Sequence, residues 1–337
     1  MTTTTHRTRR VLRLGAAMLA AGALLLSGCS GPGPDDPVIG LITKQENNPY
    51  WVTMRQIAEQ TARDERVTLI AATGTSDVDV AAQEAALRDM IDRKVDGILI
   101  APNDSTALNP LIAEARQAGI VVIAVDTPVE PSDAVDAYFA TDNTEAGRLV
   151  GAYAAAKAKQ LGLTPKVAML NLAPGVSSGE QRHEGFLEGF GLTADSPELV
   201  AQADSQGDRK LGETEMASIL SAHPDVNVIY TVNEPAALGA LTALKAANAD
   251  LARIVLVSVD GGCEAIKSVV RSGEIDATAQ QFPENMAREG VRALAWAARG
   301  GEKPSGFLNT GVELISDSPA PDVASRDVAF GVRNCWG

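Results

Sequence analysis

A regular alternation between short apolar segments and longer amphipathic segments constrains the fold of this chain more than any other feature. An apolar segment such as 97–101 contains no polar residue, which is typical of a strand buried on both faces of a sheet. Alternating segments of this kind predict parallel sheets covered by helices on both sides. The expected strands are 38–42, 67–71, 97–101, 120–125, 166–170, 199–203, 226–230, 254–259, 276–280 and 312–315. The expected helices are 50–64, 79–94, 106–118, 144–160, 179–190, 210–221, 235–246, 263–271 and 284–299, and an irregular tail is expected after 315.

This series of strands and helices runs through twice, first over 38–125 and again from 144 onward. A single hydrophobic core rarely serves more than about 250–300 residues, and the chain has 337. We therefore expect an α/β fold with two doubly wound parallel-sheet lobes.

The first 29 residues have the pattern of a secretion signal. Arginines precede an apolar run over 14–26, which is shorter than the roughly 20 residues needed to span a bilayer as a helix. The run ends at Leu26-Ser27-Gly28-Cys29, which resembles a bacterial lipobox and predicts lipidation of Cys29 and a membrane anchor. The alternative is a plain signal peptide with a chance cysteine. Export by the twin-arginine route is a further possibility, from the pattern at 8–13.

Residues 30–37 contain two Gly, three Pro and two Asp, a composition that buries no core. We expect this segment to be a flexible tether, with the folded chain beginning at Val38.

The net charge is −14, and no basic cluster follows the signal segment, which argues against a nucleic-acid partner. The three histidines, His6, His183 and His223, lack the spacing of metal ligands, so no metal site is predicted. Besides Cys29, only Cys263 and Cys335 occur, and in an oxidising compartment a disulfide between them is the simplest interpretation, with two free thiols as the alternative.

Planar polar side chains follow many of the expected strands. In open α/β sheets ligands bind outside the carboxyl ends of the strands, and two such sheets facing each other form a cleft between lobes. The candidates at strand ends are Asn48, Tyr50, Trp51, Asp126, Asn143, Arg182, Asn233, Asp260 and Gln281. Such groups satisfy the hydroxyls of a sugar, and an aromatic ring covers its apolar C–H face.

Each candidate also has a structural explanation. Asn48 and Asp142 are typical helix caps, and Tyr50 and Trp51 are equally suited to packing a helix against a sheet. The case for a binding site rests on the set as a whole.

Seven segments in order resemble the ribose/fructose-type cluster of periplasmic sugar-binding proteins, the type I solute-binding proteins of bacterial ABC transporters. They are 47–51 (NNPYW), 125–128 (VDTP), 141–143 (TDN), 182–186 (RHEGF), 233–240 (NEPAALGA), 258–263 (SVDGGC) and 281–283 (QFP). The DGGC motif, together with the ending NCWG, is closer to the fructose-type branch than to ribose binders.

The resemblance implies that Asn48, Asp126, Asn143, Arg182, Asn233, Asp260 and Gln281 hydrogen-bond the ligand and that Tyr50 and Trp51 stack on it. Two positions depart from ribose binders: Lys44 replaces a small residue and adds a donor, and 204–208 lacks the second-lobe aromatic residue. Both changes are consistent with a different ligand, such as a ketohexose or a linear polyol.

The resemblance also implies three crossings of the chain between lobes, near 141–143, 281–283 and 311–312. The expected N-terminal lobe is then 38–141 plus 283–311, and the C-terminal lobe is 142–282 plus 312–337. Cys263 and Cys335 fall in the same lobe, which agrees with a disulfide.

The expected function is binding of a monosaccharide (a fructose-like ketose or a pentose) or a sugar alcohol for an importer permease, without catalysis or cofactor. Three rival functions share part of this sequence pattern. A glycosidase would use a carboxylate pair from Asp126, Glu234 and Asp260, but nothing in the sequence keeps one of them protonated. A repressor of the same fold needs a basic helix-turn-helix where the signal segment stands. A receptor that feeds a chemoreceptor or sensor kinase, or that binds a non-sugar molecule, remains the alternative.

Overall fold

The computed structural model describes residues 36–337. The predicted signal segment 1–29, the lipidation site Cys29 and most of the predicted tether 30–37 lie outside the described residues. Within 36–337, no helix combines the length and the apolar character needed to cross a bilayer.

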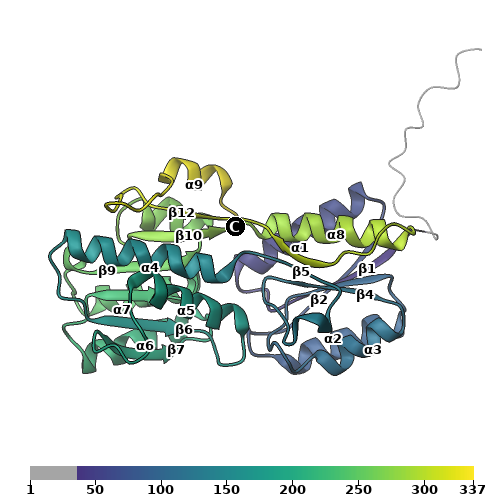
Figure 1. Ribbon diagram of the computed structural model, residues 1–337, viewed down its shortest axis with the longest axis horizontal. Helices are drawn as coiled ribbons and strands as arrows, with labels where there is room; N and C mark the ends of the chain where they lie inside the picture. Colours follow the sequence, from purple (N-terminus) through teal and green to yellow (C-terminus); the bar gives the residue numbers. More distant parts are fainter. Residues whose placement is uncertain (1–35) are drawn as a thin grey trace, which may run out of the picture.

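The first lobe is built on a six-stranded parallel sheet with the strand order β11-β5-β4-β3-β1-β2 (Figure 1). Its strands are β1 (Val38–Thr43), β2 (Thr68–Thr73), β3 (Gly97–Ile100), β4 (Val121–Val125), β5 (Ala137–Ala140) and β11 (Gly306–Asn309). Its helices are α1 (Pro49–Asp64), α2 (Val80–Asp92), α3 (Asn109–Gln117), the short η1 (Ser132–Ala134) and α8 (Pro283–Ala298).

The second lobe repeats this order with the strands β12-β10-β9-β8-β6-β7. Its strands are β6 (Val167–Asn171), β7 (Leu199–Asp204), β8 (Val228–Thr231), β9 (Val255–Asp260), β10 (Ala277–Gln281) and β12 (Val312–Ile315). Its helices are α4 (Asn143–Gln160), α5 (Ser177–Phe190), α6 (Arg209–Ala222), α7 (Glu234–Ala246), the short η2 (Leu251–Arg253) and η3 (Ala265–Val270), and α9 (Val328–Asn334). The expectation of wholly parallel sheets is corrected at one strand, since β12 runs antiparallel to β10.

The two sheets are buried on both faces because successive residues of each strand point to opposite sides. In β3, Leu99 belongs to the cluster under α1 and α8, whereas Ile98 and Ile100 belong to the cluster on the other face. Burial on both faces of the sheet therefore explains the uninterrupted apolar segments, as predicted.

The chain passes between the two sheets at three places, from β5 to α4, from β10 to α8, and from β11 to β12. All three connections are short, and Figure 1 shows the two lobes lying next to each other along the long axis of the molecule. The carboxyl ends of β1, β3 and β4 in one lobe therefore face those of β6, β8 and β9 in the other.

Four glycines set the distance between α4 and α5. A Cβ at Gly147 would overlap the Arg182 carbonyl, and one at Gly185 would overlap the Thr144 carbonyl. Gly151 and Gly189 extend the same contact along both helices. The two helices therefore pack backbone to backbone, which brings the first turn of α4 against Arg182 of α5.

The observed strands and helices differ from the expected ones in several places. The strand β5 is absent from the expected series, and so is the edge strand β11, because all four residues of β11 are exposed and its segment lacks an apolar pattern. The helix predicted over 263–271 is present, but from Ala265 to Val270 it has the wider turns of a π-helix, η3. The tail after 315 is not wholly irregular, because Asp327 caps α9 by accepting a hydrogen bond from the Phe330 N–H.

Candidate functional site

Two aspartates occupy matching positions in the two lobes. Asp126 directly follows β4, the fourth strand of the first lobe, and Asp260 ends β9, the fourth strand of the second. Both have positive φ, 63° for Asp126 and 101° for Asp260. A non-glycine residue in this region costs roughly 1–3 kcal/mol and persists where the surrounding structure holds it, which is common at functional sites. Each lobe thus presents one carboxylate from a residue whose backbone is strained.

Arg182 lies between these two carboxylates and is 4% exposed. Its Nη2 is 3.7 Å from Asp126 Oδ1, and its Nη1 is 3.5 Å from Asp260 Oδ1. Burial opposes the charge of the guanidinium, but Asp260 and Asp126 together raise the pKa of Arg182 above its ordinary value. A fixed cation therefore joins acidic groups from both lobes.

Asn143 and Gln281 hold this arginine in place. Arg182 Nε donates to Asn143 Oδ1 at 2.7 Å, and its Nη2 donates to Gln281 Oε1 at 3.2 Å. Gln281 Nε2 also donates to Asp260 Oδ1 at 2.7 Å. Both residues lie at connections between the lobes, and they contact the cavity-lining residues rather than the cavity itself.

A second cluster of polar side chains, drawn from both lobes, surrounds the Thr127 hydroxyl. Lys44 Nζ donates to Thr127 Oγ1 at 3.0 Å, and the same hydroxyl lies 2.8 Å from Asp126 Oδ2. Ser178 Oγ of the second lobe is 2.9 Å from Thr127 Oγ1. Lys44 is 1% exposed, and its Nζ lies 5.6 Å from the centre of the Trp51 ring.

The two adjacent aromatic residues begin α1. Tyr50 donates its hydroxyl to Asp126 Oδ1 at 2.9 Å, and its ring meets that of Trp51 edge to face at 4.8 Å. The Trp51 Nε1–H is buried and makes no hydrogen bond of good geometry within residues 36–337, although it lies close enough to the Asp77 carboxylate to lower the pKa of that group. Both rings line the cavity and also pack against the first-lobe core, so the packing explanation is confirmed and stacking on a ligand stays a prediction.

The asparagines at the cavity also cap helices. Asn48 Oδ1 accepts from the Tyr50 N–H at 3.0 Å, and Asn233 Oδ1 accepts from the Ala236 N–H at 3.1 Å. Asn233 Nδ2 donates to the Gly207 carbonyl at 3.1 Å. The helix that begins at Asn143 is capped by Asp142, whose side chain accepts from the Glu145 N–H, as the sequence predicts.

These residues enclose one small cavity between the lobes, with a volume of about 20 Å³. Eight of the ten candidates line it, and Asp77, Leu172 and Ser178, which the sequence did not single out, complete it. The lining consists of Lys44, Asn48, Tyr50, Trp51, Asp77, Asp126, Leu172, Ser178, Arg182, Asn233 and Asp260. Such a volume holds about one water molecule, so a larger ligand enters only when the lobes separate or side chains turn.

Asp77 is the most informative of the residues missed. It lies in the loop after β2, at the same edge of the sheet as Asp126, and its Oδ1 accepts from Gln45 Nε2 at 2.7 Å. Burial raises the pKa of the Asp77 carboxyl, while Lys44 and the Gln45 hydrogen bond act in the opposite direction. Its place in a Thr-Ser-Asp-Val-Asp loop gives the ordinary signal of a turn, so only the strand-end rule points to it.

Burial also shifts the acids of the second lobe. It raises the pKa of Asp260 to about 6, although Arg182 acts against this shift. It raises the pKa of Glu234 to about 7, with a further contribution from the charge of Asp260. Glu234 does not line the cavity; it accepts backbone N–H bonds from Gly262 at 2.6 Å and Ala265 at 3.0 Å.

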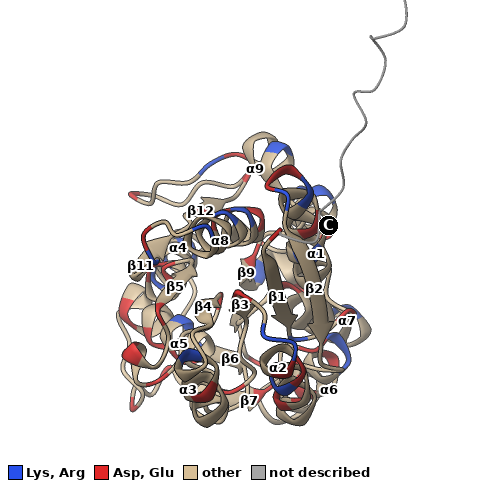
Figure 2. Ribbon diagram, turned by 90° about the vertical axis from the view of Figure 1, so that its right-hand side faces the viewer, with Lys and Arg blue, Asp and Glu red and all other residues tan. Residues whose placement is uncertain are grey.

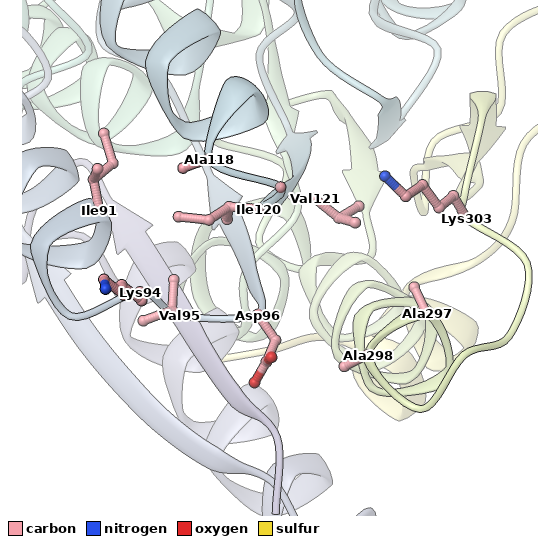
Figure 3. A pocket seen from close by; sticks show the side chains of 11 residues that line it. Ile91, Lys94, Val95, Asp96, Ala118, Ile120, Val121, Ala297, Ala298 and Lys303 are labelled. Atoms are coloured by element: carbon pink, nitrogen blue, oxygen red, sulfur yellow. The ribbon is translucent and has the colours of Figure 1, made fainter.

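A larger hollow of about 650 Å³ lies at the opposite end of the first lobe, where β3 and β4 begin (Figure 3). Ile91, Val95 and Ile120 line it, and Lys94 and Lys303 stand on opposite sides. No converging set of hydrogen-bonding groups lies there among the described residues, so the interlobe cavity is the better candidate site. Figure 2 shows basic and acidic residues interspersed over the side of the molecule that it presents.

The family model for the periplasmic binding protein domain matches residues 39–303. The chain belongs to this family. A periplasmic binding protein of this type closes two lobes around a small molecule, which agrees with the position of the cavity.

Among curated proteins, the chain is 31% identical over 284 residues to the ribose import binding protein RbsB of Salmonella typhimurium, covering 84% of this chain and 92% of that protein. It is 28% identical over 289 residues to RbsB of Bacillus subtilis, covering 82% and 90%.

Two solved structures of ABC transporter solute-binding proteins have the same fold. One is an ABC transporter periplasmic solute-binding protein of Actinobacillus succinogenes with bound D-allose, at 29% identity and a TM-score of 0.74, covering 83% of this chain and 98% of that one. The other is an ABC transporter solute-binding protein of Agrobacterium vitis bound with α-D-tagatopyranose, at 25% identity and a TM-score of 0.77, covering 90% and 100%.

The disulfide predicted for this periplasmic binding protein is present between Cys263 and Cys335, with Cα atoms 4.9 Å apart. Within residues 36–337, no group of three or more His, Cys, Asp and Glu side chains gathers as a metal site.

Proposed function

We propose that this chain is the extracytoplasmic sugar-binding component of an ABC-type importer and carries out no chemistry on its ligand. The observation that carries the proposal is the pair Asp126 and Asp260, presented from matching positions of the two lobes on either side of Arg182. Carboxylates and a guanidinium in such an arrangement satisfy several hydroxyls of one monosaccharide at once. The relatives named above, which are called binding proteins for ribose import or hold D-allose or tagatopyranose, support this class of ligand.

The proposed ligand contacts are the eight cavity-lining candidates together with Asp77 and Ser178, while Asn143 and Gln281 hold Arg182 and Asp260 from behind. The Trp51 Nε1–H, which makes no well-formed hydrogen bond beside the Asp77 carboxylate, supplies a donor for a ligand oxygen. Tyr50 and Trp51 supply the apolar surface for the C–H face of the ring.

Binding follows from hinge motion. Ligand enters between the separated lobes. Because it contacts both Asp126 and Asp260 only when the lobes are closed, it binds the closed form more tightly and shifts the equilibrium toward that form. We propose that a membrane permease receives the closed form. Two bonds across the opening stabilise that form, from the Ser105 N–H to the Gly175 carbonyl at 3.0 Å and from the Ser177 N–H to Ser105 Oγ at 3.1 Å.

Within monosaccharides we propose a fructose-like ketose, a pentose or a sugar alcohol. Lys44 lines the cavity and adds a charged donor, and the loop 204–208 contributes the Gly207 backbone beside Asn233 rather than an aromatic ring. For the position in the cell, we propose a lipid anchor at Cys29 on the outer face of the membrane, from the lipobox-like segment alone.

The test is a thermal-shift screen of residues 30–337 against D-ribose, D-allose, D-fructose, D-tagatose, D-arabinose and several sugar alcohols, followed by calorimetry. A ligand at a hundred times its Kd stabilises the fold by about 2.7 kcal/mol, which is a shift of several degrees in Tm. A large shift with one or a few of these compounds supports the proposal. No shift with any of them, against a shift with a non-sugar metabolite, would overturn the ligand class.

A further inference from the structure

The end of the tail bridges the two lobes. Figure 1 shows residue 337 between the lobes rather than on the outer face of the second one. Cys335 is joined to Cys263 of the second lobe, and the Cys263 N–H donates to the Trp336 carbonyl at 2.8 Å. The side chain of Trp336, however, belongs to the first-lobe hydrophobic cluster and is 4% exposed. Trp336 thus bridges the lobes, because its backbone is bonded to the second lobe and its side chain packs against the first.

The contacts of the Trp336 ring lead directly to the site. It meets the Tyr50 ring edge to face, with 5.1 Å between ring centres, and its Nε1–H donates to the Gln281 carbonyl at 3.0 Å. Tyr50 is thus held between Trp51 and Trp336 while its hydroxyl bonds Asp126. Trp336 itself does not line the cavity.

Gly262 leaves no room for a side chain between the Trp336 ring and the Glu234 carboxylate. A Cβ at Gly262 would lie 3.0 Å from the Trp336 ring and 2.6 Å from Glu234 Oε2. The DGGC motif thus supplies Asp260 to the cavity, a glycine that admits the Trp336 ring, and the cysteine that tethers it.

We propose that Trp336 is a positioning residue for ligand binding, which the disulfide holds in place and which acts by fixing Tyr50 against Asp126. The expected change in ligand affinity rests on the proposed function. The expected change in the mobility of Tyr50 does not. Reduction of the disulfide, or loss of the ring, frees Tyr50 and weakens binding without removing any ligand contact.

The affinity test is a double-mutant cycle with Trp336→Ala and Tyr50→Phe, using whichever of D-ribose, D-allose and D-tagatose binds the wild type most tightly. Loss of the aromatic pair raises Kd about tenfold, whereas Trp336→Phe, which keeps an edge-to-face ring, changes it about threefold or less. If Trp336 acts through Tyr50, the two losses are not additive. Additive losses would overturn the proposal, because they would mean a general structural role. Trp296→Ala, at a ring that is 64% exposed, is the matched control.

A second experiment, on protein without ligand, tests this inference independently of the proposed function. In protein carrying ¹³C-labelled tyrosine, the Tyr50 ring signal, assigned with Tyr50→Phe, is expected to show increased mobility in Trp336→Ala and Cys335→Ser but not in Trp336→Phe. If Tyr50 remains as rigid in Trp336→Ala as in the wild type, the inference is wrong whether or not any sugar binds. If Tyr50 becomes mobile while none of the sugars binds the wild type, the inference stands and the proposed ligand class fails.

Discussion

At the scale of single residues, the site depends on buried charges that compensate one another. Asp126 and Asp260 share Arg182, and all three are at most 4% exposed. Removing one partner of such a set leaves the others uncompensated, whereas changing a carboxylate to its amide keeps the shape and removes one charge. Conservative substitutions are therefore the informative ones here.

For Asp126→Asn we expect Kd for the bound sugar to rise about 100-fold, because a charge-assisted hydrogen bond is worth about 1.5–3 kcal/mol. The fold should remain cooperative, because the amide oxygen still accepts from one of Tyr50 and Thr127 and the amide N–H can donate to the Thr127 hydroxyl. Calorimetric titration and urea unfolding measure the two effects. The exposed Asp133→Asn serves as control, and wild-type affinity in Asp126→Asn would remove this residue from the proposed site.

Glu234 gives the protein a defined pH dependence. Its pKa rises from the ordinary 4.5 to about 7 in the folded state, so between these values the folded chain binds more protons than the unfolded chain. The free energy of unfolding should accordingly fall, on account of this group, as the pH rises from about 4.5 to about 7, and then level off.

Glu234→Gln should remove this fall, reducing the difference in unfolding free energy between pH 5 and pH 8 by up to about 3 kcal/mol. The amide can accept from only one of Gly262 and Ala265, so a loss of stability at every pH is expected in addition. Urea unfolding at both pH values gives the slope, with the exposed Glu188→Gln as control. An unchanged slope would show that the Glu234 carboxyl is ionised throughout this range.

At the scale of elements, the glycine contact between α4 and α5 places Arg182. Gly185→Ala puts a Cβ against the Thr144 carbonyl and within 3.0 Å of the Arg148 N–H, which forces the helices apart. The 2.7 Å bond from Arg182 Nε to Asn143 should then lengthen, and the affinity should fall about tenfold along with a loss of roughly 1–3 kcal/mol of stability.

Gly189→Ala tests the same contact one turn farther from Arg182, where a Cβ would overlap the Arg148 carbonyl. We expect a similar loss of stability with a smaller change in Kd, as measured by unfolding and calorimetry on both variants. Equal changes in Kd would show that the contact supports the lobe as a whole rather than the arginine.

The elements also show what a sequence of this kind can predict. Uninterrupted apolar runs predict the central strands because those strands are buried on both faces, and strand-end polar residues predict the site because the carboxyl ends of parallel strands meet. The edge strand β11 lacks that burial and therefore the pattern. Asp77 and Trp336 were missed as site residues because their roles arise from contacts with distant segments, Lys44 and Gln45 in one case and Tyr50 in the other.

At the scale of the whole molecule, closure depends on the contacts opposite the hinge. The Ser105 hydroxyl accepts the Ser177 N–H across the opening, and Ser105 is 2% exposed. Ser105→Ala leaves that N–H without a partner in the closed form only, a cost of about 1–3 kcal/mol.

We expect Ser105→Ala to weaken sugar binding about tenfold, chiefly by faster release. Stopped-flow measurement of the association and release rates, with the exposed Ser132→Ala as control, checks this. An effect confined to the association rate would mean that Ser105 acts before the lobes close.

The three connections between the lobes limit the kind of motion that capture requires. A single linker would let one lobe swivel freely about the other, whereas three short linkers, from β5, β10 and β11, oppose both twisting and sliding. What remains is close to rotation about one axis, so the approach of Asp260 to Asp126 follows a nearly fixed path. The lobes therefore sample few orientations other than the open and closed ones. The association rate is then governed by how often ligand diffuses into the open cleft.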